Sequence, residues 1–207
     1  MLITVCRIYD SYPDANRAIL ALEAADVPPS ATSVISNNSD GWYKPAKTPS
    51  IVPAQDKAVN SEIGGKVEGA AVGAAIGATT ATAASLITML AIPGVGTVVG
   101  AGWLAAIIGS IAIGSMAGGL LGALTNAGVS EDDAQVFVES VRRGGTLVTT
   151  RVPEADVPKV ESAMNRSAVN IEERRHLYRK SGWQSFDPNA MPYTADQVRC
   201  ERVLHAH

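Results

Sequence analysis

The longest uncharged stretch of this chain limits what the chain can fold into. From Gly69 to Ser130 no Asp, Glu, Lys, Arg or His occurs. Lys, Glu, Arg and Asp are almost always exposed, so a water-facing segment of this length would normally carry several of them. A membrane-spanning helix needs about 20 mostly apolar residues, which leaves room here for two helices and a turn. Pro93, Gly94 and Gly96 lie near the middle and predict that turn, because proline and glycine break helices.

Small residues recur at every fourth position on both sides of this turn. A spacing of four places residues on one stripe of a helix, and small residues there let a second helix approach closely. The two rows predict a tightly packed antiparallel helical hairpin over residues 63–128, or a seam between copies of the chain. The helix-packing and oligomerisation residues would be Gly65, Gly69, Gly73, Gly77, Ser110, Gly114, Gly118 and Gly122.

The flanking charges favour a membrane hairpin with both ends in the cytoplasm. Lys57 and Lys66 precede the uncharged stretch, Arg142 and Arg143 follow it, and the turn carries no Lys or Arg. Positive residues gather on the cytoplasmic side of a bacterial inner membrane. Trp103 would lie at the far membrane interface or pack inside the protein. This pattern predicts the inner membrane as location, both termini cytoplasmic and the lipid bilayer as partner; a cytoplasmic protein is the alternative.

The rest of the sequence predicts a small α+β domain. Runs of β-branched residues indicate strands, and apolar residues at helical spacing indicate helices. Ser11 and Ser130 stand where a helix N-cap is expected. The expected strands cover 2–9, 31–36, 146–152 and part of 167–174, and the expected helices cover 14–26, 131–143 and 156–166.

Without the hairpin and the helix after it, these elements follow the order βαββαβ. That is the split pattern of the ferredoxin-like fold. Its halves would be residues 1–37 and 129–174, separated by a linker at 38–62 and the hairpin at 63–128. Both halves must close one sheet, so both ends of the hairpin emerge on the same side. Residues 175–207 form a C-terminal arm, in which Thr194 and Gln197 predict a capped helix at 195–204.

The sequence offers no catalytic, cofactor-binding or metal-ligating motif. Its three histidines are His176, His205 and His207, of which the last two stand at the chain end, and Cys6 and Cys200 fit no metal spacing. No nucleophile elbow, zinc-protease motif or phosphate-binding loop is present. The net charge of −3 argues against a non-specific nucleic-acid binder. The chain is therefore predicted to be no enzyme, with no cofactor, no small-molecule substrate and itself as partner.

Three segments of the sequence carry a family resemblance. They are AIPGVG (91–96), GGLLGAL (118–124) and RRGGTLV (142–148). With the βαβ start they resemble the bacterial heat-induced or general stress protein domain family, and within it the members with an inserted glycine-zipper membrane hairpin. The resemblance covers roughly residues 2–172. It implies a stress-linked protein and brings no catalytic residues with it.

These features favour a non-enzymatic, stress-linked, self-associating membrane protein that supports or remodels the membrane or acts as a scaffold. A second hypothesis is a soluble self-assembling structural protein, in which the Gly/Ala helices form the buried core of a large oligomer or filament. A third is a small-molecule-sensing module, because ferredoxin-like sheets often expose one face to ligands.

Overall fold

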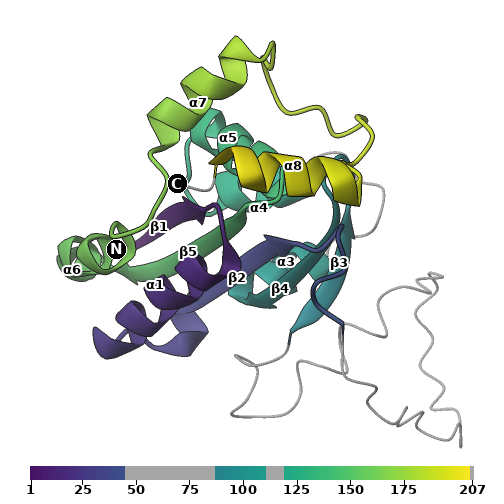
Figure 1. Ribbon diagram of the computed structural model, residues 1–207. Helices are drawn as coiled ribbons and strands as arrows, with labels where there is room; N and C mark the ends of the chain where they lie inside the picture. Colours follow the sequence, from purple (N-terminus) through teal and green to yellow (C-terminus); the bar gives the residue numbers. More distant parts are fainter. Residues whose placement is uncertain (45–86, 111–118, 206–207) are drawn as a thin grey trace, which may run out of the picture.

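The computed structural model describes residues 1–44, 87–110 and 119–205. Within these ranges the chain forms a five-stranded antiparallel sheet with helices on both faces (Figure 1). The strands are β1 (Leu2–Tyr9), β2 (Thr32–Asn37), β3 (Thr88–Ile92), β4 (Gly96–Gly102) and β5 (Thr146–Pro153). The helices are α1 (Tyr12–Ala24), α3 (Trp103–Ser110), α4 (Leu120–Asn126), α5 (Glu131–Arg142), α6 (Val157–Met164), α7 (Ile171–Lys180) and α8 (Ala195–His205), with 3₁₀ turns η1 (Pro29–Ala31) and η3 (Glu154–Asp156).

The sheet is built around two parallel strands that an antiparallel strand separates. β1 and β2 are joined by α1, and β5 lies between them and pairs antiparallel with both. β4 pairs with the other side of β2, and β3 pairs with β4, which gives the order β1-β5-β2-β4-β3. The α+β class and the strands predicted at 2–9, 31–36 and 146–152 are confirmed.

Side chains from the two faces of the sheet enter two separate cores. Along β1, Val5 and Tyr9 join the core under α1 and α6, whereas Cys6 and Ile8 join the core under α3, α4 and α5. Successive residues of a strand point to opposite faces, so one strand serves both cores. Figure 1 shows the resulting layers, with α1 and α6 on one side of the sheet and α4 and α5 on the other.

Residues 88–102 depart from the expected helical hairpin because they form two strands. β3 and β4 pair antiparallel, and residues 93–95 form the turn between them. Gly94 and Gly96 have φ angles of +73° and +104°, a region that glycine occupies without strain. The turn therefore stands where the sequence predicts it, but it joins strands.

The reason for this departure is that the middle of β4 is buried on both faces. Val98 and Val99 point to opposite sides of the sheet, and both are buried. A strand buried on both faces reads as a continuous apolar run and lacks the alternation that usually marks a strand. The β-branched residues Thr97, Val98 and Val99 carried the remaining signal.

The second half of the predicted hairpin folds into the protein core. α3 and α4 are 8 and 7 residues long. Leu104, Leu120 and Leu124 are fully buried in the same core as Phe137 of α5. Among the described residues, no helix has the length and apolar character needed to span a membrane. Residues 63–86 and 111–118 of the predicted hairpin lie outside the described residues.

Trp103 packs inside the protein, which is one of the two places the sequence allowed for it. Its indole Nε1 donates a hydrogen bond to the carbonyl oxygen of Ala31 at 3.1 Å. The guanidinium of Arg151 lies over the indole ring, 3.5 Å from its centroid. Such a cation is attracted by the negative face of the ring. Trp103 thereby ties the start of α3 to β5.

The strand predicted within residues 167–174 is absent. Val169 donates one backbone hydrogen bond to Ile8 at 2.9 Å, and α7 then begins at Ile171. The side chain of Asn170 accepts from the backbone N–H groups of residues 172 and 173, so it caps this helix and ends any extended pairing. The fourth strand of a ferredoxin-like sheet is therefore not formed by this segment.

The predicted helix starts are confirmed at three places. Ser11 caps α1, and Ser130 caps α5 by accepting from the N–H of Asp133 at 3.2 Å. Thr194 and Gln197 form a reciprocal capping box at α8, with distances of 3.3 and 2.9 Å. Each cap satisfies N–H groups that have no partner within the helix.

Replacement of Leu124 by alanine tests whether α4 belongs to the core. We expect Leu124→Ala to lower the free energy of unfolding by about 2–5 kcal/mol, because the substitution leaves a cavity among fully buried side chains. Leu20→Ala on α1 is the matched control, since Leu20 is 55% exposed, and it should change stability by less than about 0.5 kcal/mol. Urea unfolding measures both. Equal effects of the two substitutions would contradict the core position of α4.

Candidate functional site

The structure brings few of the predicted helix-packing residues together. Ser110 ends α3, and Gly122 lies within α4. The remaining residues of the two rows lie outside the described residues; they are Gly65, Gly69, Gly73, Gly77, Gly114 and Gly118. The described residues therefore show no packed pair of glycine rows.

The predicted turn residues are Pro93, Gly94 and Gly96. Gly94 and Gly96 lie against residues 181–205, the part of the predicted C-terminal arm that follows α7, which we call the arm. A Cβ atom at Gly94 would lie 2.8 Å from the carbonyl oxygen of Asp187 and 2.9 Å from the ring of Phe186. These distances are shorter than real Cβ contacts, so the arm passes over the turn as closely as it does only because residue 94 is glycine.

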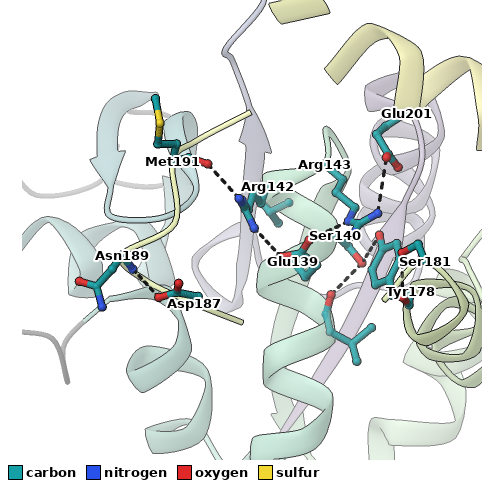
Figure 2. A network of polar contacts seen from close by, with 12 residues as sticks. Glu139, Ser140, Arg142, Arg143, Tyr178, Ser181, Asp187, Asn189, Met191 and Glu201 are labelled. Atoms are coloured by element: carbon teal, nitrogen blue, oxygen red, sulfur yellow. Dashed lines mark hydrogen bonds and ion pairs between the residues drawn. The ribbon is translucent and has the colours of Figure 1, made fainter. Parts of the chain in front are cut away.

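A fully buried carboxylate organises the contact between the arm and α5 (Figure 2). Glu139 is 1% exposed, and its two oxygens accept from Arg143 at 2.7 Å and from Arg142 at 3.3 Å. Arg142 also donates to the carbonyl oxygen of Met191 at 2.9 Å, and Arg143 reaches the carboxylate of Glu201 on α8 at 3.4 Å. One side chain of α5 thus orients two guanidinium groups, and each of them contacts the arm.

Two tyrosine rings complete the surroundings of these arginines. The guanidinium of Arg143 lies 4.3 Å from the ring centroid of Tyr178 on α7, and that of Arg142 lies 4.9 Å from the ring centroid of Tyr193. Burial raises the pKa of both tyrosine hydroxyls. Burial alone would lower the pKa of Arg143, but the hydrogen bond and charge of Glu139 outweigh it and the pKa is raised. The arginine therefore stays charged and the tyrosines stay neutral at physiological pH.

Side chains from two distant segments close the C-terminal end of α5. Asn37, the last residue of β2, donates its amide to two carbonyl oxygens of the last turn of α5, at 3.0 and 3.1 Å. Arg202 of α8 donates to the carbonyl oxygens of Gly144 and Asn37 at 2.9 and 3.2 Å, and it binds the carboxylate of Asp40 at 2.5 Å. Such donors satisfy carbonyl groups that have no partner within the helix.

Arg142 and Arg143 are mostly buried in the structure. The sequence places them as the positive flank of a membrane hairpin. The structure turns both inward, with side chains that are 14% and 12% exposed. The reason is Glu139, because a buried carboxylate without a cationic partner would be strongly destabilising.

A groove of about 1380 Å³ lies beside this network, between the start of α1, residues 166–170, α7 and α8. Its walls carry charges of both signs, and several are paired with each other. Arg174 binds Asp10 at 2.7 Å, and Arg17 binds Asp14. The first pair joins α7 to the segment just before α1, and the second pair lies within α1 itself.

Metal ligands and nucleophiles can be sought among the carboxylates, cysteines and serines of the described residues. Within these ranges no group of three or more His, Cys, Asp or Glu side chains gathers in a way that could hold a metal ion. Both cysteines are free: Cys200 is exposed, and burial raises the pKa of the Cys6 thiol to about 12, which keeps it protonated. The hydroxyl of Ser140 donates to a carbonyl oxygen of its own helix and accepts from Tyr178.

The role of Glu139 was missed in the sequence, although a signal exists. The residue stands in the apolar run VFVESV, where a charge needs a partner. Arg142 and Arg143 follow at the third and fourth positions, which is the spacing of ion pairs on a helix. The contacts with the arm, by contrast, join residues far apart in the chain and leave no local signal.

Comparison with known proteins adds no relative, because no family model, no curated protein and no solved structure matches the chain. The resemblance to the general stress protein domain family therefore stays a prediction from the sequence.

Replacement of Gly94 by alanine tests the packing of the arm on the β3–β4 turn. We expect Gly94→Ala to speed hydrogen exchange in residues 186–205 at least tenfold, since the new methyl group displaces the arm. Gly41→Ala is the matched control, because Gly41 has a similar φ of +68° but no atom within 4 Å. If the two variants exchange alike in the arm, the contact at Gly94 does not hold it.

Removal of the Glu139 charge tests the network itself. Glu139→Gln should lower the free energy of unfolding by about 3–5 kcal/mol, because it leaves two partly buried guanidinium groups without their counter-charge. Glu172→Gln is the control, since Glu172 is mostly exposed and its pair with Arg175 should contribute about 0–1 kcal/mol. Denaturant unfolding monitored by tryptophan fluorescence compares them. A loss of less than about 1 kcal/mol for Glu139→Gln would contradict the role given to this carboxylate.

Proposed function

We propose that this protein is a non-enzymatic structural protein that associates with copies of itself, and that residues 63–86 contact the same segment of other copies. The connectivity of the chain is the observation that carries this proposal. The chain leaves the sheet after β2, which ends at Asn37, and rejoins it at β3, which begins at Thr88. Both strands belong to one sheet, so the segment between them leaves and rejoins a single folded body.

The amino-acid pattern of this segment suits contact between copies. Its small residues recur at every fourth position, and in a helix they would form one stripe that lets another helix approach closely. From Gly69 onward the segment has no charged residue, so identical segments meet without electrostatic repulsion. The row consists of Gly65, Gly69, Gly73 and Gly77.

The same connectivity favours self-assembly over a membrane-spanning hairpin. Two spans need about 40 mostly apolar residues. β3 begins at Thr88, so the uncharged residues before it, 69–87, have the length of one span. One span would place residues 44 and 87 on opposite sides of a bilayer, although both adjoin the same sheet. Association of the segment with its own copies needs no such separation.

A non-enzymatic role is supported by the engagement of the polar cluster around Glu139. Its arginines, tyrosines and carboxylates contact one another and the arm. The split unit of β1, α1, β2 and β5, with α6 packed beside α1, supports a distant relation to ferredoxin-like domains. A link to stress rests on the family resemblance alone.

A substitution in the glycine row tests the proposal. Gly73→Leu should weaken assembly about tenfold or more, because a large side chain would separate helices that touch through this stripe. Ala75→Leu is the control, since two residues further along a helix the side chain points to the opposite side. Light scattering in detergent-free buffer gives the mass of each variant.

The wild type and Ala75→Leu should form the same defined oligomer, and Gly73→Leu a smaller species. A wild-type protein that is monomeric, or that is uniform only in detergent, would contradict the proposed self-assembly. The second result would favour the membrane hypothesis.

A further inference from the structure

We propose that β3, an edge strand of the sheet, pairs antiparallel with β3 of a second copy, so that two sheets join into one continuous sheet. This inference rests on the proposed self-association and names a surface for it. β3 pairs with β4 along one side, and no other strand within the described ranges pairs with it. Figure 1 shows β3 at the end of the sheet opposite β1. An edge strand presents backbone N–H and C=O groups that can pair with another strand.

The two edges of the sheet, β1 and β3, differ in how well they are protected from pairing with another strand. β1 carries Arg7, whose guanidinium binds Glu161 of α6 at 3.0 Å. Val169 also donates to the backbone of β1. Charged side chains and covering segments are the usual means by which proteins keep an edge strand from pairing. β3, with the sequence TMLAI, has no charge, no proline and no glycine within it.

The side chains of β3 divide between the core and solvent. Leu90 and Ile92 join the core under α3, α4 and α5. Met89 and Ala91 point to the other face and are exposed, and Met89 is 45% exposed. Ile87, which precedes the strand, is 48% exposed. An uncharged edge therefore coincides with an exposed apolar stripe, which is the pattern expected of a strand that pairs with another chain.

The chemistry of the edge favours an identical strand as its partner. Antiparallel pairing about a two-fold axis uses the same residues of both chains, so one surface is complementary to itself. Like charges opposite each other would destabilise such a pair, and β3 contributes none. A charged partner strand would find no counter-charge on β3. The pairing closes a dimer, so larger assemblies through the glycine row would contain an even number of chains.

Lysine substitutions on the exposed side of β3 test this inference. In the double variant Met89→Lys/Ala91→Lys, like charges would meet across the two-fold axis, so the pairing should weaken at least tenfold. The control is Thr97→Lys, because Thr97 is exposed on the same face of the sheet but lies on β4, inside the edge. Mass by light scattering and sedimentation is measured for each, with circular dichroism and thermal unfolding to verify the fold.

We expect the lysine double variant to lose the dimer and Thr97→Lys to keep it. The Gly73→Leu variant should fall to a dimer that β3 holds together. Pairing through β3 is overturned if Gly73→Leu is monomeric, or if the wild type associates and the double variant forms the same oligomer. In both cases the proposed self-association stands. If Thr97→Lys weakens the association equally, the copies contact the face of the sheet, and pairing along the edge of β3 is overturned. A monomeric wild type would overturn both proposals.

A cysteine cross-link gives a second measurement that does not depend on how the fold tolerates lysine. Met89→Cys in a Cys200→Ser background should form a covalent dimer with a short bifunctional maleimide, whereas Thr97→Cys in the same background should not. Cys6 is buried and should not react. Absence of the dimer for Met89→Cys would also overturn the pairing.

Discussion

The pairing of β4 with β2 is the interaction on which the rest of the structure depends. It holds residues 96–102, from the middle of the uncharged stretch, inside the sheet and positions α3 beside them. A Cβ atom at Gly102 would lie 2.3 Å from the carbonyl oxygen of Thr32, and one at Gly100 would lie 2.9 Å from Ala105 of α3. These two glycines let β4 lie against β2 and let α3 close over it. Small residues here serve the packing of a sheet.

The fixed position of β4 brings the C-terminal arm into the same body. The β3–β4 turn lies under residues 186–188, and Asn37 at the end of β2 caps α5. α5 in turn carries Glu139, whose carboxylate orients two arginines toward the arm. A buried carboxylate is costly unless it is paired, so the arginines and the carboxylate hold one arrangement together. The segments before and after the uncharged stretch, each too small for a stable core of its own, thereby contribute to one sheet and its cores.

The sequence predicted those parts of the fold that carry a local signal. Strands with β-branched residues, the N-caps at Ser11 and Ser130 and the capping box at Thr194 are of this kind. The turn at Gly94 was also predicted, but the two strands that it joins, β3 and β4, were not. A stretch without charge is compatible with a membrane helix and with a strand buried on both faces, and periodicity separates the two poorly in short runs. The contacts of the arm and the exposed edge of β3 depend on tertiary packing, which no local pattern encodes.

The most direct test of this account is amide hydrogen exchange of the wild-type protein in detergent-free buffer. The central claim is that residues 96–102 form a strand inside the sheet. Their backbone N–H groups should then exchange as slowly as those of β2 and β5, because central strands open only with global unfolding. Fast exchange of residues 96–102, or protection that develops only after detergent is added, would contradict the pairing of β4 with β2.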